Sequence, residues 1–240
     1  MEILTQVGGE FLSRWGHYLS GVTWVGLLYY FNFVQVPAFA AMEAGPRTAA
    51  IRTIVPRGLW WFRWAAVLTV LTGVSILGFQ ERLTDMDFWK TPSGLSIGTG
   101  ILLALVMFVN VWGIIWRNQK IVIASAERTA TGGEADPNAA AAGRKALTAS
   151  RTNALFSIPM LFFMGATSHF APVFDGADGS GRLLYWVAVL VIIGVIEAIA
   201  VMAPAAGSGL AVHLDNHRNT IIGGFVLTVI FYALFQIVNG

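Results

Sequence analysis

Two of the four histidines in this chain stand in long apolar segments, where an ionisable side chain is costly. His17 lies near the start of the first such segment, and His169 follows the apolar run 161–168. Ionisable side chains inside a bilayer are rare, and they usually serve a function. Two imidazoles that meet at one depth on different helices are suited to hold a haem iron between them. The two histidines therefore predict a haem b site.

Two other interpretations of these histidines stay open at this point. Each imidazole can be an interfacial polar group that hydrogen-bonds to a neighbouring carbonyl. Zinc or copper is a second alternative, but two histidines without carboxylate or thiolate partners make an incomplete site. The chain contains no cysteine, so no thiolate can complete it.

Three further polar residues inside apolar segments are candidates for catalysis. Glu197 is an acidic residue deep in a segment, where it can relay protons or hydrogen-bond to a neighbouring helix as a neutral acid. Arg63 can pair with Glu197, extend its charge to the interface or bind a haem propionate. Asn32 can contact a substrate, although hydrogen bonding between helices is the usual role of such an amide.

The composition predicts an all-α integral membrane protein. Apolar residues make up 56% of the chain, charged residues 12%, and the mean hydropathy is +0.67. Soluble domains carry about 25% charged residues. Several segments approach the length needed to cross about 30 Å of hydrocarbon. We expect one domain over residues 1–240, a bundle of six transmembrane helices at about 12–39, 59–79, 95–116, 154–173, 183–203 and 220–238.

The distribution of lysine and arginine predicts the orientation of these spans. The loops between spans one and two, three and four, and five and six carry ten basic residues, against four on the side of the termini. Positive charge is enriched on the cytoplasmic side. We therefore expect a multi-pass protein of the bacterial inner membrane with both termini in the periplasm. Residues of about 118–151 form a cytoplasmic excursion, either a loop or an extension of the fourth helix.

This topology brings the two histidines to a similar depth. Span one runs from outside to inside and span four from inside to outside. His17 and His169 each lie about one helical turn from the outer end of their span. At about 1.5 Å rise per residue, both stand roughly 6–8 Å below the periplasmic boundary.

Several motifs resemble known membrane families. His17 followed by the run 24–29 (Trp-Val-Gly-Leu-Leu-Tyr) resembles the first helix of HemJ-type membrane protoporphyrinogen oxidases, in which the helix-borne histidine is a haem ligand. Over nearly the whole chain, the sequence more closely resembles the membrane domain of the bacterial urate hydroxylase PuuD family. The segments that carry this second resemblance are 55–64, 110–116, 150–153 and 157–160.

The PuuD resemblance implies an oxidoreductase of purine catabolism that oxidises urate and passes electrons to cytochrome c. Typical members carry a cytochrome c domain after the last span, whereas these 240 residues contain no Cys-x-x-Cys-His motif. We therefore expect a separate periplasmic cytochrome c or a larger membrane complex as partner, together with membrane lipid and no nucleic acid.

Two alternative functions remain at this stage. The chain can be a non-enzymatic accessory subunit of a respiratory or photosynthetic complex, or a HemJ-like protoporphyrinogen oxidase. Six expected spans in place of four count against the second alternative. The sequence leaves the substrate, the oligomeric state and enzymatic activity itself open.

Overall fold

The computed structural model describes residues 2–170, 181–202 and 210–239, and these residues form helices and connections without a strand. Long helical segments follow one another along the chain, and two of them contain a π-helical turn, η2 and η4. The elements are η1 (Glu2–Leu4), α1 (Gln6–Tyr29), η2 (Tyr30–Gln35), α2 (Val36–Ala41), α3 (Ala44–Phe79), η3 (Phe88–Lys90), α4 (Pro92–Val109), η4 (Asn110–Ile115), α5 (Trp116–Ala130), α6 (Ala139–His169), α8 (Arg182–Val201), η5 (Leu210–Asp215) and α9 (His217–Asn239).

Among the described residues, four helical segments are long and apolar enough to cross a membrane: 44–79, 92–130, 182–201 and 217–237. They contain most or all of the second, third, fifth and sixth predicted spans. The first predicted span falls in the continuous segment 6–41, and the fourth falls mostly in α6. Neither segment meets the same criterion of length and hydropathy, so these two spans stay predictions. Residues 171–173 and 203, at the ends of two predicted spans, lie outside the described residues.

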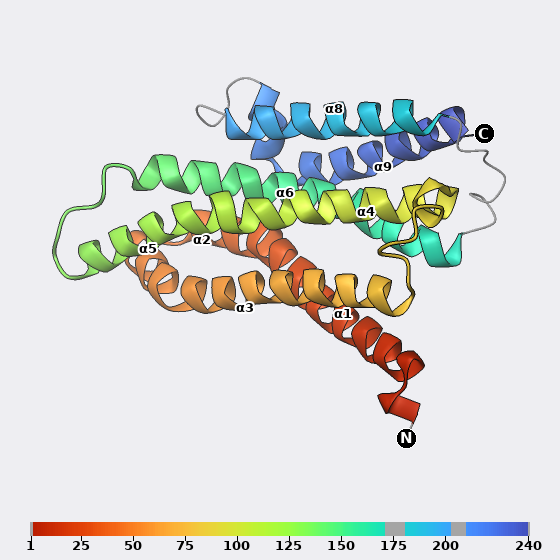
Figure 1. The fold of residues 1–240 in the computed structure, drawn as a ribbon. Coiled ribbons are helices and arrows are strands. Elements are labelled where there is room, and N and C mark those ends of the chain that lie inside the picture. The colour runs from red at the N-terminus through yellow and green to blue at the C-terminus, as the bar shows by residue number, and fades with distance from the viewer. Residues whose placement is uncertain (1, 171–180, 203–209, 240) are drawn as a thin grey trace.

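Helix α6 is less apolar than these four segments because it carries several polar side chains. These side chains are buried against other parts of the protein. Arg151, Thr152, Asn153 and Ser157 are all at most 5% exposed, and Figure 1 shows α6 running through the middle of the molecule. In a membrane, a polar group is tolerated where protein rather than lipid surrounds it. The helix begins at Ala139, so residues 139–149 extend the fourth helix.

The long helices alternate in direction. In Figure 1, α1 begins, α3 ends, α4 begins and α6 ends on the right, where the N-terminus lies; we call this the amino-terminal end. The helices α2 and α5 and the connection 131–138 lie at the opposite end. Helices α8 and α9 form a layer on one side of α6, and α1 and α3 lie on the other side. The elements that carry His17 and His169 therefore reach the same end of the bundle.

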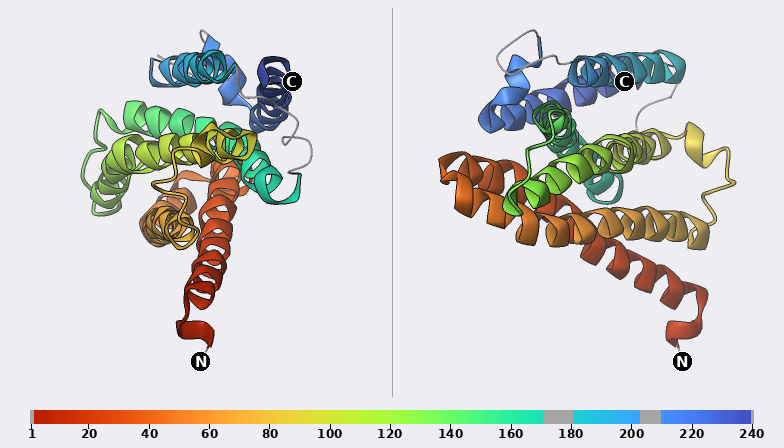
Figure 2. Two further views of the ribbon diagram at one scale, coloured as in Figure 1. Left: turned by 45° about the vertical axis from the view of Figure 1, so that its right-hand side comes forward. Right: turned by 90° about the vertical axis from the view of Figure 1, so that its left-hand side faces the viewer.

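Helix α1 packs closely on α3 through small residues and diverges from the other helices toward its start (Figure 2). A Cβ atom added at Gly16 would lie 3.2 Å from the methyl carbon of Thr72, and one at Gly9 would lie 2.6 Å from the ring of Phe79. Small residues let helix backbones approach closely, which is how helices gain contact area in membranes. This contact sets the position of the face of α1 that carries His17.

Capping residues fix where the helices begin. The side chain of Thr91 accepts a hydrogen bond from the backbone N–H of Gly94 at 3.0 Å, and Pro92 occupies the first position of α4. Threonine at the cap and proline at the first position are both favoured because the first N–H groups of a helix lack partners. In α1, Thr5 caps the N–H of Gly8 in the same way.

A polar turn closes the connection between α5 and α6. The backbone N–H of Asn138 donates to the carboxylate of Asp136 at 2.9 Å, and Arg128 forms an ion pair with the same carboxylate. The hydrogen bond from Asn138, supported by Arg128, holds the pKa of Asp136 below its ordinary value.

We predict that acid loosens this turn. Because the pKa of Asp136 is lowered in the folded state, its stabilising contribution is present above the ordinary carboxyl value of about 4 and is lost as the pH falls through the lowered value. Limited proteolysis between residues 131 and 138, with an acid-tolerant protease, should accelerate as the pH falls below about 4. The variant Asp136→Asn should be cleaved faster at neutral pH and show little further change with acid; an unchanged cleavage profile would contradict the prediction.

Candidate functional site

The side chain of His17 lies between α1 and α3. Its Nδ1 atom is 2.9 Å from the backbone carbonyl oxygen of Thr69 and 3.2 Å from the hydroxyl of Thr72. The ring also lies close to the α3 backbone, since a Cβ atom added at Gly73 would be 3.2 Å from its Cε1 atom. The imidazole is thereby held in one orientation from the neighbouring helix.

These contacts leave Nε2 as the atom of His17 that is available to a ligand. A carbonyl oxygen only accepts hydrogen bonds, so the proton is assigned to Nδ1 and the lone pair to Nε2. Within the described residues, no hydrogen bond reaches Nε2. Histidines that bind metal usually donate their other N–H to a carbonyl or carboxylate. The hydrogen bond to a carbonyl, which the sequence analysis gave as an alternative to metal ligation, is present. It also holds the ring in the orientation that a metal-binding histidine needs.

His169 is the last residue of α6, and its side chain is exposed. No contact joins it to His17 among the described residues, so its part in ligation stays a prediction. Among these residues there is also no group of three or more histidine and acidic side chains placed to hold a metal ion.

Trp24 provides a second polar group on the His17 face of α1. It follows His17 by seven residues, about two helical turns, so the two side chains share one face. Its side chain is fully buried, and its indole N–H has no hydrogen-bond partner within the described residues. Buried donors are usually paired. An oxygen atom of a bound group would satisfy this donor.

Arg63 stacks on aromatic rings and does not pair with Glu197. Its guanidinium carbon lies 3.4 Å from the centre of the Trp116 ring, and its Nε donates to the carbonyl of Leu59 at 3.1 Å. Stacking on tryptophan stabilises a cation that is partly removed from water. Arg63 and Glu197 each have other partners, so the predicted ion pair between them is not formed.

Glu197 instead belongs to an amide network between three helices. The side-chain N–H groups of Asn110 donate to Glu197 at 2.6 Å and to Asn153 at 2.9 Å. The amide of Asn153 in turn donates to the carbonyl of Met107 at 2.9 Å. Asn110 is the first residue of the π-helical turn η4, so this network joins η4 to α6 and α8. Hydrogen bonding between helices is the role that the structure shows for these groups.

We predict that Asn153→Ala destabilises the bundle by roughly 1–2 kcal/mol, because two hydrogen bonds between helices are lost in a buried site. Asn118→Ala is the matched control, since the amide of Asn118 donates only to Ile114 in its own helix. The apparent melting temperature in detergent should fall clearly for Asn153→Ala and little for Asn118→Ala. Equal shifts for the two variants would argue against the network.

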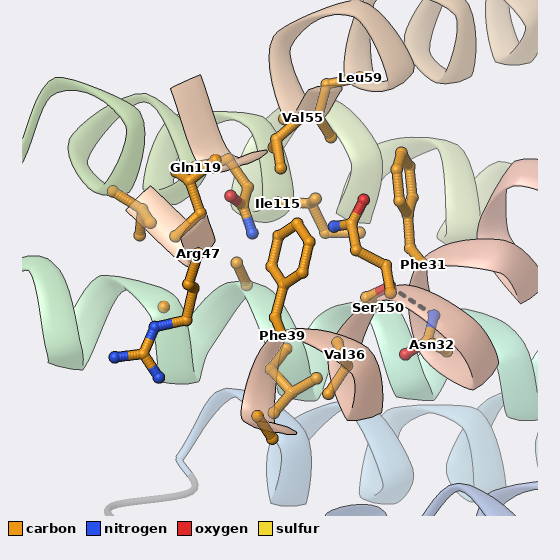
Figure 3. A pocket seen from close by; sticks show the side chains of 17 residues that line it. Phe31, Asn32, Val36, Phe39, Arg47, Val55, Leu59, Ile115, Gln119 and Ser150 are labelled. Atoms are coloured by element: carbon orange, nitrogen blue, oxygen red, sulfur yellow. Dashed lines mark hydrogen bonds between the residues drawn. The ribbon is translucent and has the colours of Figure 1, made fainter. Parts of the chain in front are cut away.

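Asn32 lines a cavity at the end of the bundle opposite the amino-terminal end. The cavity has a volume of about 490 Å³ and lies between η2, α2, α3, η4, α5 and α6 (Figure 3). Asn32 is 1% exposed, and its amide nitrogen donates to Ser150 of α6 at 2.8 Å. The expected bond between helices is therefore present, and the same side chain also borders a space that can hold a ligand.

One comparison with known proteins gives a match, and it concerns the middle of the chain. Residues 90–203 match the urate oxidase N-terminal family. The match begins at Lys90 beside α4 and runs through α6 and α8. It includes Asn110, Asn153, His169 and Glu197, while His17, Asn32 and Arg63 lie before it. No curated protein and no solved structure matches the chain significantly.

The structure adds functional groups that sequence reasoning missed. The carbonyl oxygen of Thr69 orients His17, but a backbone group leaves no signal in the sequence. The π-helical turns η2 and η4 carry Asn32 and Asn110, and π-helical turns are frequent at functional sites. In the sequence, each of these turns is marked only by an asparagine inside an apolar run. Such an asparagine predicts polar contacts, but it does not predict a π-helical turn.

Proposed function

We propose that this chain is a haem b-binding electron-transfer module of a urate-oxidising enzyme in the bacterial inner membrane. In this proposal it crosses the membrane six times, with both termini in the periplasm. His17 and His169 would hold the haem iron. Electrons from urate or a related substrate leave to a periplasmic cytochrome c or to a larger membrane complex.

The observation that carries the proposal is the placement of His17. Its Nδ1 is held 2.9 Å from a backbone carbonyl, and its Nε2 is left for a ligand. Four helices long and apolar enough to cross a membrane support a membrane location. The match of residues 90–203 to the urate oxidase N-terminal family supports the substrate class.

The residues of the chain have separable parts in this function. A bound haem supplies an iron that takes up and releases one electron at a time. The Thr69 carbonyl holds the His17 ring in place and makes its Nε2 a stronger donor. Helix α3 packs on α1 through Gly9 and Gly16, which keeps the ring at a fixed distance from the backbone of α3. Trp24 offers a buried N–H to an oxygen of the bound group.

The test is a visible spectrum of the full chain purified after haem-replete expression. We expect a Soret band that shifts on reduction with dithionite. Membranes that contain the protein and an added soluble cytochrome c should then reduce the cytochrome when urate is supplied. Absence of the Soret band would reject the haem site. A haem spectrum without urate-dependent reduction would reject the urate assignment and favour an accessory or HemJ-like role.

A further inference from the structure

The cavity that contains Asn32 lies far from the proposed haem site. Along the first helical segment, His17 and Gln35 are separated by about 27 Å at 1.5 Å per residue. The cavity is within the size range of small-molecule sites, which is about 300–1,000 Å³. It needs an explanation of its own, because the haem proposal does not use it.

Two hydrogen-bond acceptors in this cavity have no partner. The amide nitrogen of Asn32 donates to the carbonyl of Leu28 and to Ser150, each at 2.8 Å. Because the Leu28 carbonyl can only accept, the amide of Asn32 is fixed in this orientation and its oxygen is the free atom. Neither the oxygen of Asn32 nor that of Gln35 has a hydrogen-bond partner within the described residues.

Both acceptors stand on the π-helical turn η2, which spans Tyr30–Gln35. Leaving a buried polar atom without a partner costs about 1–3 kcal/mol. Two such atoms that line one cavity indicate a ligand that brings hydrogen-bond donors. Figure 3 shows Asn32 and Ser150 joined by their hydrogen bond at one side of the cavity.

Arg47, Gln119 and Ser150 also line the cavity, and its other walls are apolar. Phe31 and Phe39 contribute aromatic rings, and Val55, Leu59 and Ile115 contribute aliphatic side chains (Figure 3). Val55, Leu59 and Ile115 are at most 5% exposed. A ligand that fits such walls has an apolar aromatic body and few polar groups.

We propose that this cavity binds a membrane quinol. A quinol has an aromatic ring, two O–H donors and an apolar tail, and it is dissolved in the membrane to which the apolar helices belong. Its hydroxyl groups donate to the free oxygens of Asn32 and Gln35, while its ring packs between the phenylalanine and aliphatic side chains. The oxidised quinone lacks these donors, so it leaves the two acceptors unpaired and binds more weakly.

Binding of duroquinol and duroquinone to the purified full chain tests this proposal. Calorimetric titration under anaerobic conditions should show duroquinol binding at least about tenfold more tightly than duroquinone, since one unpaired buried acceptor costs that much. Gln35→Met, which keeps the length of the side chain and removes its acceptor, should weaken duroquinol binding about tenfold. Equal affinities for the two forms, tighter duroquinone binding, or no binding of duroquinol would overturn the proposal.

Matched variants separate the cavity from the fold and from the haem. Gln236→Met makes the same change on α9, where Gln236 donates to Tyr232, and should leave duroquinol binding unchanged. Ile51→Trp fills the cavity from α3 and should also abolish binding, which keeps the test valid if Gln35→Met fails to fold. His17→Ala should leave duroquinol binding intact, so failure of the haem proposal is distinguishable. Binding of urate that Ile51→Trp abolishes, with no binding of duroquinol, would overturn the quinol proposal and make the cavity a urate site.

Discussion

The variant His17→Ala is expected to lose the Soret band of the protein. In the proposed site, Nε2 of His17 is one of two iron ligands, and its ring is already oriented by the Thr69 carbonyl at 2.9 Å. Alanine has no ligand atom, and no other histidine among the described residues shares this position. The affinity for haem should fall by about tenfold or more, the effect of losing roughly 1.4 kcal/mol or more of binding free energy, and the absorbance at the Soret maximum per unit of purified protein should fall with it.

Two control variants make the His17 result specific. His213→Ala removes an exposed histidine of η5 and should leave the spectrum unchanged. Thr72→Val removes the longer contact to Nδ1, at 3.2 Å, but keeps the carbonyl of Thr69, and it should retain most of the haem. Added imidazole should restore part of the Soret band to His17→Ala by supplying the missing ligand. An unchanged spectrum in His17→Ala would reject His17 as a ligand.

The variant Gly94→Ala is expected to destabilise the fold severely. A Cβ atom at Gly94 would lie 2.1 Å from the carbonyl oxygen of Phe88 and 2.8 Å from the Cα of Trp89. Both are backbone atoms, so no side-chain rotation can relieve the contact, and the turn before α4 has to move. We expect the free energy of unfolding to fall by about 3 kcal/mol, which is the upper part of the usual range for overpacking. For a chain of this size, this lowers the melting temperature by roughly 6–12 °C.

Gly26→Ala is the matched control for Gly94→Ala. A Cβ atom at Gly26 meets nothing within 4 Å, and the residue is exposed within α1. Alanine stabilises a helix interior relative to glycine by about 0.5–1 kcal/mol. The melting temperature, measured by size-exclusion chromatography with fluorescence detection, should therefore rise slightly for Gly26→Ala and fall strongly for Gly94→Ala. Similar melting of the two variants would show that the turn before α4 yields easily.

The sequence predicted helices correctly but placed several boundaries too narrowly. The second span was expected at 59–79, whereas α3 begins at Ala44. Pro56 lies inside α3 and does not end it, although proline usually interrupts a helix. The third span was expected to end at residue 116, and the helical segment continues to Ala130. Hydropathy detects the apolar part of a helix only, so polar extensions beyond it are missed.

The polar candidates were found from the sequence, but their partners were not. Arg63 and Glu197 looked complementary because both are charged residues in apolar runs. The fold places Arg63 on Trp116 and Glu197 beside Asn110, so each charge has a different neighbour. Which residues meet depends on the rotation of each helix about its axis, and that rotation is decided by packing between helices.

The sequence by itself determined the class of protein and the identity of the unusual polar residues, because composition and hydropathy are local properties of the chain. Only the tertiary structure decided which polar atoms are paired and which are free. The bond from His17 to Thr69 joins residues 52 apart, and the bond from Asn32 to Ser150 joins residues 118 apart. Such pairings exist only when distant helices pack together, and among the described residues they leave Nε2 of His17 and the oxygen of Asn32 without a hydrogen-bond partner.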